Sequence, residues 1–94
     1  MTDPLTQTFT PSPEAVDSSV GDEIVILHLG NGTYYGLDPL GTRIWAMLKD
    51  GHQPPAIRDA IVAEYEVSAE VVERDMRAFL RDLLAHDILV VPPG

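Results

Sequence analysis

The chain has 94 residues, which is enough for one small domain with a single core. Its 15 acidic and 6 basic residues give a net charge of −9, which repels phosphate backbones and predicts no nucleic-acid partner. The absence of cysteine excludes disulfides, thiolate metal sites and a cysteine nucleophile.

Residues 1–14 are polar and contain Pro4, Pro11 and Pro13. Proline and small polar residues disfavour regular structure near a terminus, so we expect a flexible N-terminal arm. The arm lacks the basic-then-apolar order of a signal peptide. No apolar run in the chain reaches the roughly 20 residues that span a bilayer. We therefore expect a cytoplasmic protein without a membrane partner.

Three short strands are expected after the arm. Residues 15–20 predict a weak first strand, and residues 24–29 form an apolar run rich in β-branched side chains. Gly30-Asn31-Gly32 predicts a hairpin turn, because Gly and Asn tolerate the positive φ of tight turns. The next strand holds Tyr34-Tyr35. Both faces of the middle strand are apolar, so the tyrosine strand is expected at a sheet edge, where backbone groups lack partners.

Three helices are expected next, each with its own start or stop signal. Asp38 can cap the first helix at Pro39 and Gly51 can end it. Pro54-Pro55 opens the second helix, and Ser68 caps the third. Apolar residues at helical spacing predict the buried stripes. They are Leu40, Ile44, Trp45, Met47 and Leu48; then Ile57, Ala60, Ile61 and Tyr65; then Val72, Met76, Phe79, Leu80, Leu83 and Leu84.

The third helix has two further features. Glu70–Arg74 and Glu73–Arg77 are i, i+4 pairs in the favourable order and are expected on its exposed side. A strip of small and acidic residues flanks the apolar stripe, so it can border a groove without filling it. The strip consists of Val71, Asp75, Ala78, Asp82 and His86.

The order of strands and helices predicts an α+β domain of winged-helix type. We expect an N-terminal three-stranded antiparallel sheet packed on a three-helix bundle over residues 15–91. Within it, residues 88–91 are expected to return as a short strand, and residues 92–94 form a C-terminal tail.

No constellation of catalytic or metal-binding residues is recognisable. His28, His52 and His86 show no metal-ligand spacing, and each is interpreted as structural or exposed. No phosphate-binding loop and no nucleophile–base pair can be named. The sequence therefore predicts no cofactor, no metal and no catalytic residue.

In residues 32–51, a strand with Gly32, Tyr34-Tyr35 and Leu37-Asp38 leads into a helix with Gly41 and Ile44-Trp45, and Gly51 follows that helix. This stretch resembles the PqqD-like family. The family pattern is a Gly-x-Tyr-Tyr-x-Leu-Asp strand, a helix with Gly-x-x-Ile-Trp, and a glycine after it. The similarity extends over roughly residues 14–91, with one departure at Asp87, where the family usually has glycine. The positions that carry the pattern are Gly32, Tyr34, Tyr35, Leu37, Asp38, Gly41, Ile44, Trp45, Leu48 and Gly51.

The resemblance implies a non-catalytic peptide-binding module. Family members are recognition elements for ribosomally synthesised, post-translationally modified peptides. They bind the leader segment of a precursor as an extra strand, between the third strand and the third helix, and present it to a separate modifying enzyme. We expect Tyr35→Pro to abolish this binding. The resemblance implies the peptide-binding residues Thr33, Tyr34, Tyr35, Gly36, Val72, Asp75, Met76, Phe79 and Asp82.

Several readings stay open within and beyond this family. The Tyr-Tyr strand and the short chain favour a stand-alone lasso-peptide member, whose partners are a leader protease and a cyclase. A pyrroloquinoline quinone chaperone that serves a radical-SAM enzyme is the alternative. In other classes, Arg74, Arg77 and Arg81 allow a DNA-binding winged helix, and a dimerisation domain without a peptide ligand is a third option.

Overall fold

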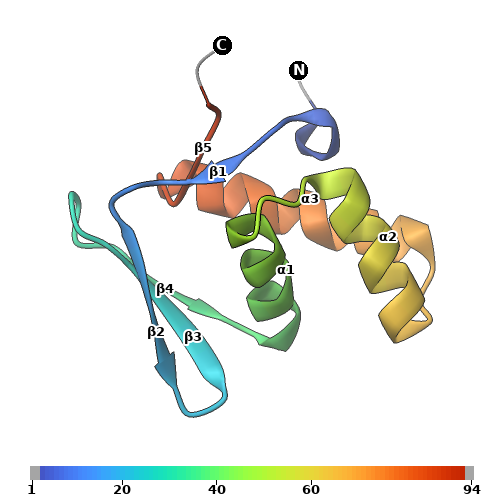
Figure 1. Ribbon diagram of the computed structural model, residues 1–94, viewed down its shortest axis with the longest axis horizontal. Helices are drawn as coiled ribbons and strands as arrows, with labels where there is room; N and C mark the ends of the chain where they lie inside the picture. The colour runs from blue at the N-terminus through green and yellow to red at the C-terminus, as the bar shows by residue number, and fades with distance from the viewer. Residues whose placement is uncertain (1–2, 93–94) are drawn as a thin grey trace.

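The computed structural model describes residues 3–92. Residues 1–2 and 93–94 lie outside the described residues, and with them most of the tail expected at 92–94. The predicted α+β architecture is confirmed: a three-stranded sheet lies at one side of three helices (Figure 1). The elements are η1 (Pro4–Thr6), β1 (Thr10–Pro11), β2 (Ala15–Val20), β3 (Glu23–His28), β4 (Tyr34–Leu37), α1 (Pro39–Lys49), α2 (Pro54–Tyr65), α3 (Ala69–Ala85) and β5 (Leu89–Val90).

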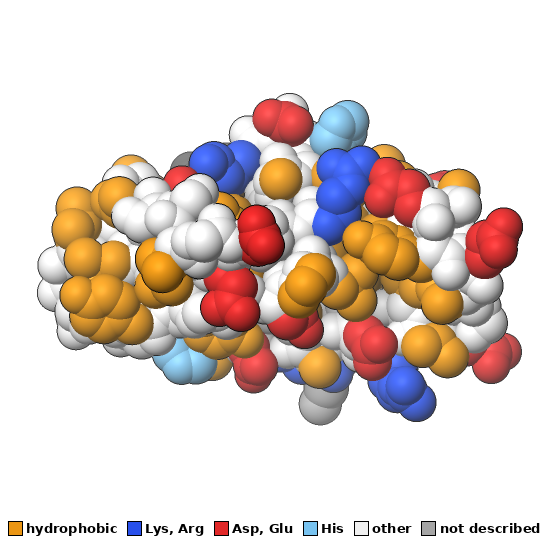
Figure 2. Space-filling model, turned by 90° about the horizontal axis from the view of Figure 1, so that it is seen from below, with side chains coloured by type: hydrophobic (Ala, Val, Ile, Leu, Met, Phe, Trp, Pro, Cys, Tyr) orange, Lys and Arg blue, Asp and Glu red, His pale blue; other side chains and the backbone are white. Residues whose placement is uncertain are grey.

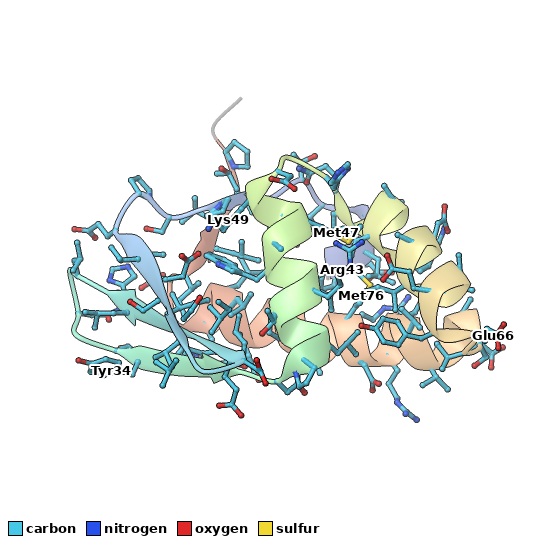
Figure 3. The ribbon with its side chains drawn as sticks, turned by 60° about the horizontal axis from the view of Figure 1, so that its bottom comes forward. Tyr34, Arg43, Met47, Lys49, Glu66 and Met76 are labelled. Atoms are coloured by element: carbon cyan, nitrogen blue, oxygen red, sulfur yellow. The ribbon has the colours of Figure 1, made fainter. Side chains whose placement is uncertain are left out.

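The sheet is antiparallel in the order β2-β3-β4, so β3 is the central strand and β4 is an edge, as predicted. Successive side chains alternate between its faces, and Ile26 and Leu37 point into the core. The other face is left open, and hydrophobic side chains gather at this end of the molecule (Figure 2). Tyr34 belongs to that open face: it is 71% exposed and lies at the sheet end, far from α2 (Figure 3).

A buried histidine supports the turn between β3 and β4. His28 Nδ1 accepts the backbone N–H groups of Gly30 and Asn31 at 3.1 and 3.2 Å. Because Nδ1 accepts both bonds, it carries no proton in this arrangement. The structural interpretation of His28 therefore has a specific cause: the imidazole caps the turn that precedes the edge strand.

The predicted cap of α1 is present, since Asp38 Oδ1 accepts the Gly41 N–H at 2.6 Å. Further along α1, the Trp45 indole N–H and Lys49 Nζ donate to one Asp17 oxygen, at 2.7 and 2.6 Å. The hydrogen bonds from Lys49 and then Trp45 lower the pKa of Asp17. This triad joins β2 of the sheet to the C-terminal half of α1.

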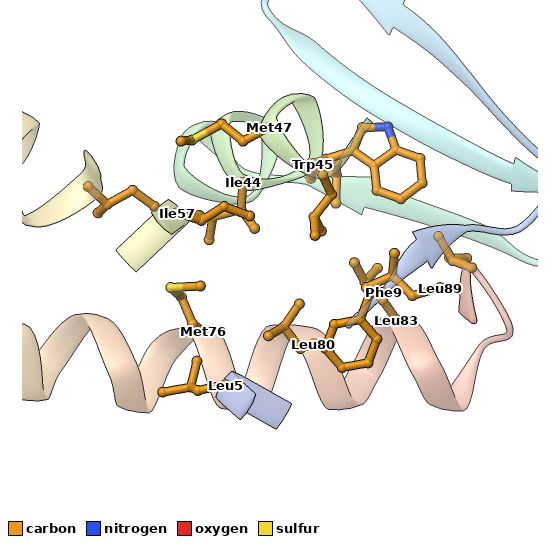
Figure 4. Close-up of a cluster of buried hydrophobic side chains, with 14 of the residues drawn as sticks. Leu5, Phe9, Ile44, Trp45, Met47, Ile57, Met76, Leu80, Leu83 and Leu89 are labelled. Carbon is orange, nitrogen blue, oxygen red and sulfur yellow. The ribbon is translucent and has the colours of Figure 1, made fainter. Parts of the chain in front are cut away.

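The core lies between α1 and α3 (Figure 4). Ile44 of α1 lies opposite Met76 and Leu80 of α3, whereas the Trp45 ring turns toward the sheet, and all four side chains are buried. A fully buried aliphatic side chain contributes about 1.5–3 kcal/mol relative to exposure, so each of these core residues stabilises the domain. The core thus holds α3 rigidly beside the sheet edge.

The expectation of a flexible arm over residues 1–14 is wrong for its described part. Leu5 and Phe9 are 5% and 2% exposed, and η1 contacts α2 and α3. Arg77 donates two bonds to Asp3, at 3.0 and 3.1 Å, and β1 pairs with β5. The prolines were misleading, because one begins a 3-10 turn and another lies in an edge strand.

Three other details also differ from expectation. Arg77 pairs with Asp3 instead of Glu73, and Glu73 accepts from Arg58 at 3.2 Å, because longer-range partners reach these side chains. Tyr65 is 49% exposed, because α2 ends there and its side chain is only half covered.

Candidate functional site

The edge of β4 offers unpaired backbone groups. The His28 N–H donates to the Thr33 carbonyl at 2.9 Å, so this pair is hydrogen-bonded across the β3–β4 ladder. Bonded and non-bonded pairs alternate in antiparallel sheets, and Tyr35 is therefore bonded to β3 as well. Tyr34 and Gly36 direct their N–H and C=O groups outward. Within residues 3–92 these groups have no hydrogen-bond partner.

A groove runs beside this edge, between β4, the first turn of α1 and α3. It consists of three adjoining hollows with volumes of about 160, 130 and 160 Å³. The first, beside β4, shares Asp38 and Phe79 with the second. The second shares Leu40 and Asp75 with the third, which lies between α2 and α3. Shared walls make the three hollows one track that starts at β4 and follows α3 toward its N-terminus.

Phe79 forms the wall between the first two hollows. Its ring meets Tyr35 edge-on, with centroids 6.4 Å apart and planes at 61°. A Cβ added at Gly41 would lie 3.1 Å from the Phe79 ring, so glycine is what lets α1 approach α3 this closely. The depth of the groove therefore depends on a missing side chain in α1.

A hydrogen bond joins β4 to α3 at the β4 end of the track. The Tyr35 hydroxyl donates to Asp82 Oδ2 at 3.2 Å, and the His86 ring packs edge-on against Tyr35 at 5.3 Å. Burial, and then the Asp82 carboxylate, raise the pKa of Tyr35, so the phenol stays protonated and keeps donating. The bond fixes the spacing between the edge strand and the helix.

The groove is acidic. Asp38 and Asp75 line it, and Asp82 stands beside Tyr35 at its end. Carboxylates also lie between hydrophobic areas across the middle of the face in Figure 2. With a net charge of −9, the surface favours a ligand with basic groups near its polar rim.

The structure brings together part of the expected site. Tyr35, Gly36, Asp75 and Phe79 line the track, and Asp82 adjoins it through Tyr35.

The remaining expected residues are placed differently. Tyr34 offers only its backbone, because its ring lies on the opposite face of the sheet. The Thr33 carbonyl is already used by His28. Met76 is fully buried in the core, so no ligand contacts it in this conformation. Val72 is nearly buried and forms part of the third hollow.

Sequence reasoning missed several walls of the groove. Asp38 was interpreted only as a cap and Leu40 only as core, yet both line two hollows. The signal was present in the strand–cap–helix junction, since a chain that turns from an edge strand into a helix must leave its first turn beside that edge.

Other kinds of site are not visible in the described part of the chain. Among residues 3–92, no group of three or more His, Asp or Glu side chains is placed to hold a metal ion. None of the described helices is both long and apolar enough to cross a membrane.

An open strand edge beside a groove of apolar and acidic residues characterises this small α+β domain. The family described as coenzyme PQQ synthesis protein D (PqqD) matches residues 23–89, and the chain belongs to this family.

Two solved structures resemble the chain closely. "TbiB1 in Complex with the TbiA(beta) Leader Peptide" is 46% identical, with 90% of this chain and 99% of that chain covered and a TM-score of 0.83. "Lasso peptide synthetase B1 complexed with the leader peptide" is 28% identical, with 88% and 98% covered and a TM-score of 0.81. No curated protein matches the sequence.

Proposed function

We propose that this protein is a non-catalytic recognition module for the leader segment of a ribosomally made precursor peptide. The leader adds to the free edge of β4 as a fourth strand, and its side chains enter the groove along α3. The observation that carries the proposal is the pair of outward-facing residues, Tyr34 and Gly36, beside the groove between β4 and α3. Both similar structures hold leader peptides, which supports this choice of ligand.

The module presents the precursor to a separate enzyme. A lasso-peptide pathway is favoured, with a leader protease and a cyclase as partners, because one of the similar structures is described as a lasso peptide synthetase B1 complexed with the leader peptide. The family description supports one alternative, presentation of a precursor to a radical-SAM enzyme in pyrroloquinoline quinone synthesis. Neither partner requires a catalytic group in this chain.

The other classes receive less support. A DNA-binding winged helix needs a basic face, but Arg77 is engaged by Asp3 and the groove is lined with carboxylates. A dimerisation domain would use the same free edge against a second copy. It is distinguished by light scattering, because a peptide ligand would keep the protein monomeric.

A titration tests the proposal. ¹⁵N-labelled protein is mixed with the TbiA(beta) leader peptide and, separately, with the leader of the precursor encoded beside this protein's own gene. We expect the largest amide shifts at Tyr34 and Gly36, because their N–H groups gain partners. Unchanged amides along residues 33–37 with both peptides at saturating concentration would reject strand addition at β4.

A further inference from the structure

The turn between β3 and β4 contains a reactive pair of residues that peptide binding does not use. Asn31 is the only asparagine in the chain, it is exposed, and Gly32 follows it directly. Asparagine is thermally labile, because its side-chain amide can react with the backbone nitrogen of the next residue. Glycine at that next position favours the reaction, since it has no Cβ to obstruct the approach and its backbone is the most flexible. The turn is therefore a place where the chain can deamidate without an enzyme.

The reaction needs only water. The Gly32 amide loses its proton, and its nitrogen forms a bond with Asn31 Cγ. The Cγ–Nδ2 bond breaks, ammonia leaves with a proton from the solvent, and a five-membered succinimide ring remains. Water opening the ring at Cγ gives aspartate with the original main chain. Water opening it at the main-chain carbonyl gives isoaspartate, whose main chain runs through Cβ and is one carbon longer.

Hydrogen bonds hold Asn31 in an unreactive arrangement. The Gly32 N–H donates to the His28 carbonyl at 2.8 Å, so the attacking nitrogen is engaged. Asn31 Oδ1 accepts the Thr33 N–H at 2.9 Å, which fixes the side-chain amide to the residue beyond Gly32. The buried His28 ring adds a third bond, because its Nδ1 accepts the Asn31 N–H at 3.2 Å. The ring can therefore close only after the turn has opened.

The two products differ in what they do to this turn. Aspartate keeps an oxygen in place of Asn31 Oδ1, so the Thr33 N–H keeps its acceptor. Isoaspartate carries its free carboxylate directly on Cα and lengthens the turn by one main-chain carbon. The turn sets the pairing in which the His28 N–H donates to the Thr33 carbonyl at 2.9 Å. Lengthening it displaces the start of β4, and with it the outward backbone groups of Tyr34 and Gly36.

We propose that Asn31 is a deamidation site that the folded turn keeps unreactive, and that its isoaspartyl product disables the edge of β4. The reaction itself depends only on the turn. The loss of binding rests on the proposed function and extends it, because the lifetime of the peptide-binding edge is limited by the turn that precedes it. Ageing then converts the protein into a mixture of binding and non-binding molecules.

Peptide mapping by mass spectrometry tests the reaction. The protein is incubated in warm, mildly alkaline buffer, either folded or unfolded in guanidinium chloride. We expect Asn31 to be converted about 10-fold more slowly in the folded protein, because the bonds to His28 and Thr33 must break before the ring closes. Equal rates in the two states overturn the protection, and no conversion in the unfolded chain overturns the site itself. Neither result depends on the proposed function, since no peptide is present.

Calorimetric titration with the TbiA(beta) leader peptide tests the consequence. The isoaspartyl form is separated from the aspartyl form by chromatography and compared with fresh protein. We expect it to bind about 5- to 150-fold more weakly, which corresponds to leaving an outward peptide group unpaired. Asn31→Asp should bind within about twofold of the original, because the acceptor for Thr33 remains. Asn31→Ser, aged in the same way, controls for other chemical changes and should keep its affinity, since serine also supports turns.

The outcomes separate this proposal from the proposed function. Undiminished binding by the isoaspartyl form overturns the proposal, and so does an equal loss of affinity in Asn31→Asp. If fresh protein fails to bind the peptide, the proposed function fails and the loss of binding on ageing fails with it, whereas the mapping result for Asn31 stands.

Discussion

β2 and β4 are the two edges of one sheet, yet only β4 borders a groove. The Leu29 N–H donates to the Glu14 carbonyl at 2.9 Å, so the alternation along β2 leaves Asp17 and Ser19 facing outward. Both strands thus expose unpaired backbone groups. Beside β4 stand the Phe79 ring and three hollows, whereas Asp17 is tied to α1. An open edge can pair with any strand, and the adjoining side chains decide which strand.

The largest loss of leader affinity is expected when an outward-facing backbone N–H group of β4 is removed. Gly36→Pro deletes such a donor on β4 and Ser19→Pro deletes one on β2. Leaving a peptide carbonyl unpaired costs about 1–3 kcal/mol, so we expect leader binding about 5- to 150-fold weaker for Gly36→Pro only. Calorimetric titration of each variant makes the measurement.

Gly36→Ala is the matched control, because a Cβ at Gly36 meets nothing within 4 Å and the N–H remains. Equal loss of binding in both proline variants would contradict the distinction between the edges. This pair replaces Tyr35→Pro, since the Tyr35 N–H faces β3 and its loss would damage the sheet itself.

The second-largest loss of leader affinity is expected when the Phe79 ring is removed from the groove. Phe79→Ala removes the ring between the first two hollows, and we expect leader affinity to fall about 10-fold. The variant should also lose about 1–3 kcal/mol of stability, because the half-buried ring packs on Tyr35. Leu84→Ala removes a half-buried side chain elsewhere on the same helix and should lose stability without losing affinity. Urea unfolding and anisotropy separate the two quantities, and equal affinity losses would refute the role of Phe79.

A change on β2 is expected to lower the stability of the protein without changing its affinity for the leader. Asp17→Ala leaves the buried Trp45 indole N–H without its acceptor, which costs about 1–3 kcal/mol in the free energy of unfolding. Leader affinity, measured at a temperature where the variant is fully folded, should stay within about twofold of the original. Weakened binding in the folded variant would show that β2 and β4 are not independent.

The smallest effect is a dependence on acid pH. Arg77 lowers the pKa of Asp3, and Lys49 with Trp45 lowers the pKa of Asp17. Both carboxylates therefore contribute stability that is fully present above their unfolded pKa of about 3.9 and is lost as the pH falls through the lower folded values. The double variant Asp3→Asn, Asp17→Asn should show a shallower loss of stability below about pH 4. An unchanged pH profile would mean that these pairs contribute nothing.

Local patterns were sufficient to predict most of the fold. The Gly-Asn-Gly turn, the Asp38-Pro39 start and the Ser68 cap are each set by neighbouring residues, so their elements appear where expected. Phe9 could not be placed this way, since its burial depends on helices that follow far along the chain. Met76 shows the same limit, because helical spacing cannot tell a core position from a groove position one turn away.

The groove itself was only partly predictable. Strand alternation alone gives the edge, and Tyr35 and Gly36 follow from it. The third hollow could not be predicted, because it depends on the angle between α2 and α3, and the spacing of apolar residues does not encode that angle. Tyr65 was expected inside for that reason and instead stands at the rim.

The N-terminal segment has a practical consequence for anyone who shortens this protein. The family match spans residues 23–89 and would suggest cutting there. Such a fragment loses Phe9, the partner strand of β5 and the whole of β2. It would then expose the α3 side chains that Leu5 and Phe9 cover, and β3 would become a second open edge. A trimmed protein could bind peptides on the wrong strand and report an interaction that the intact chain prevents.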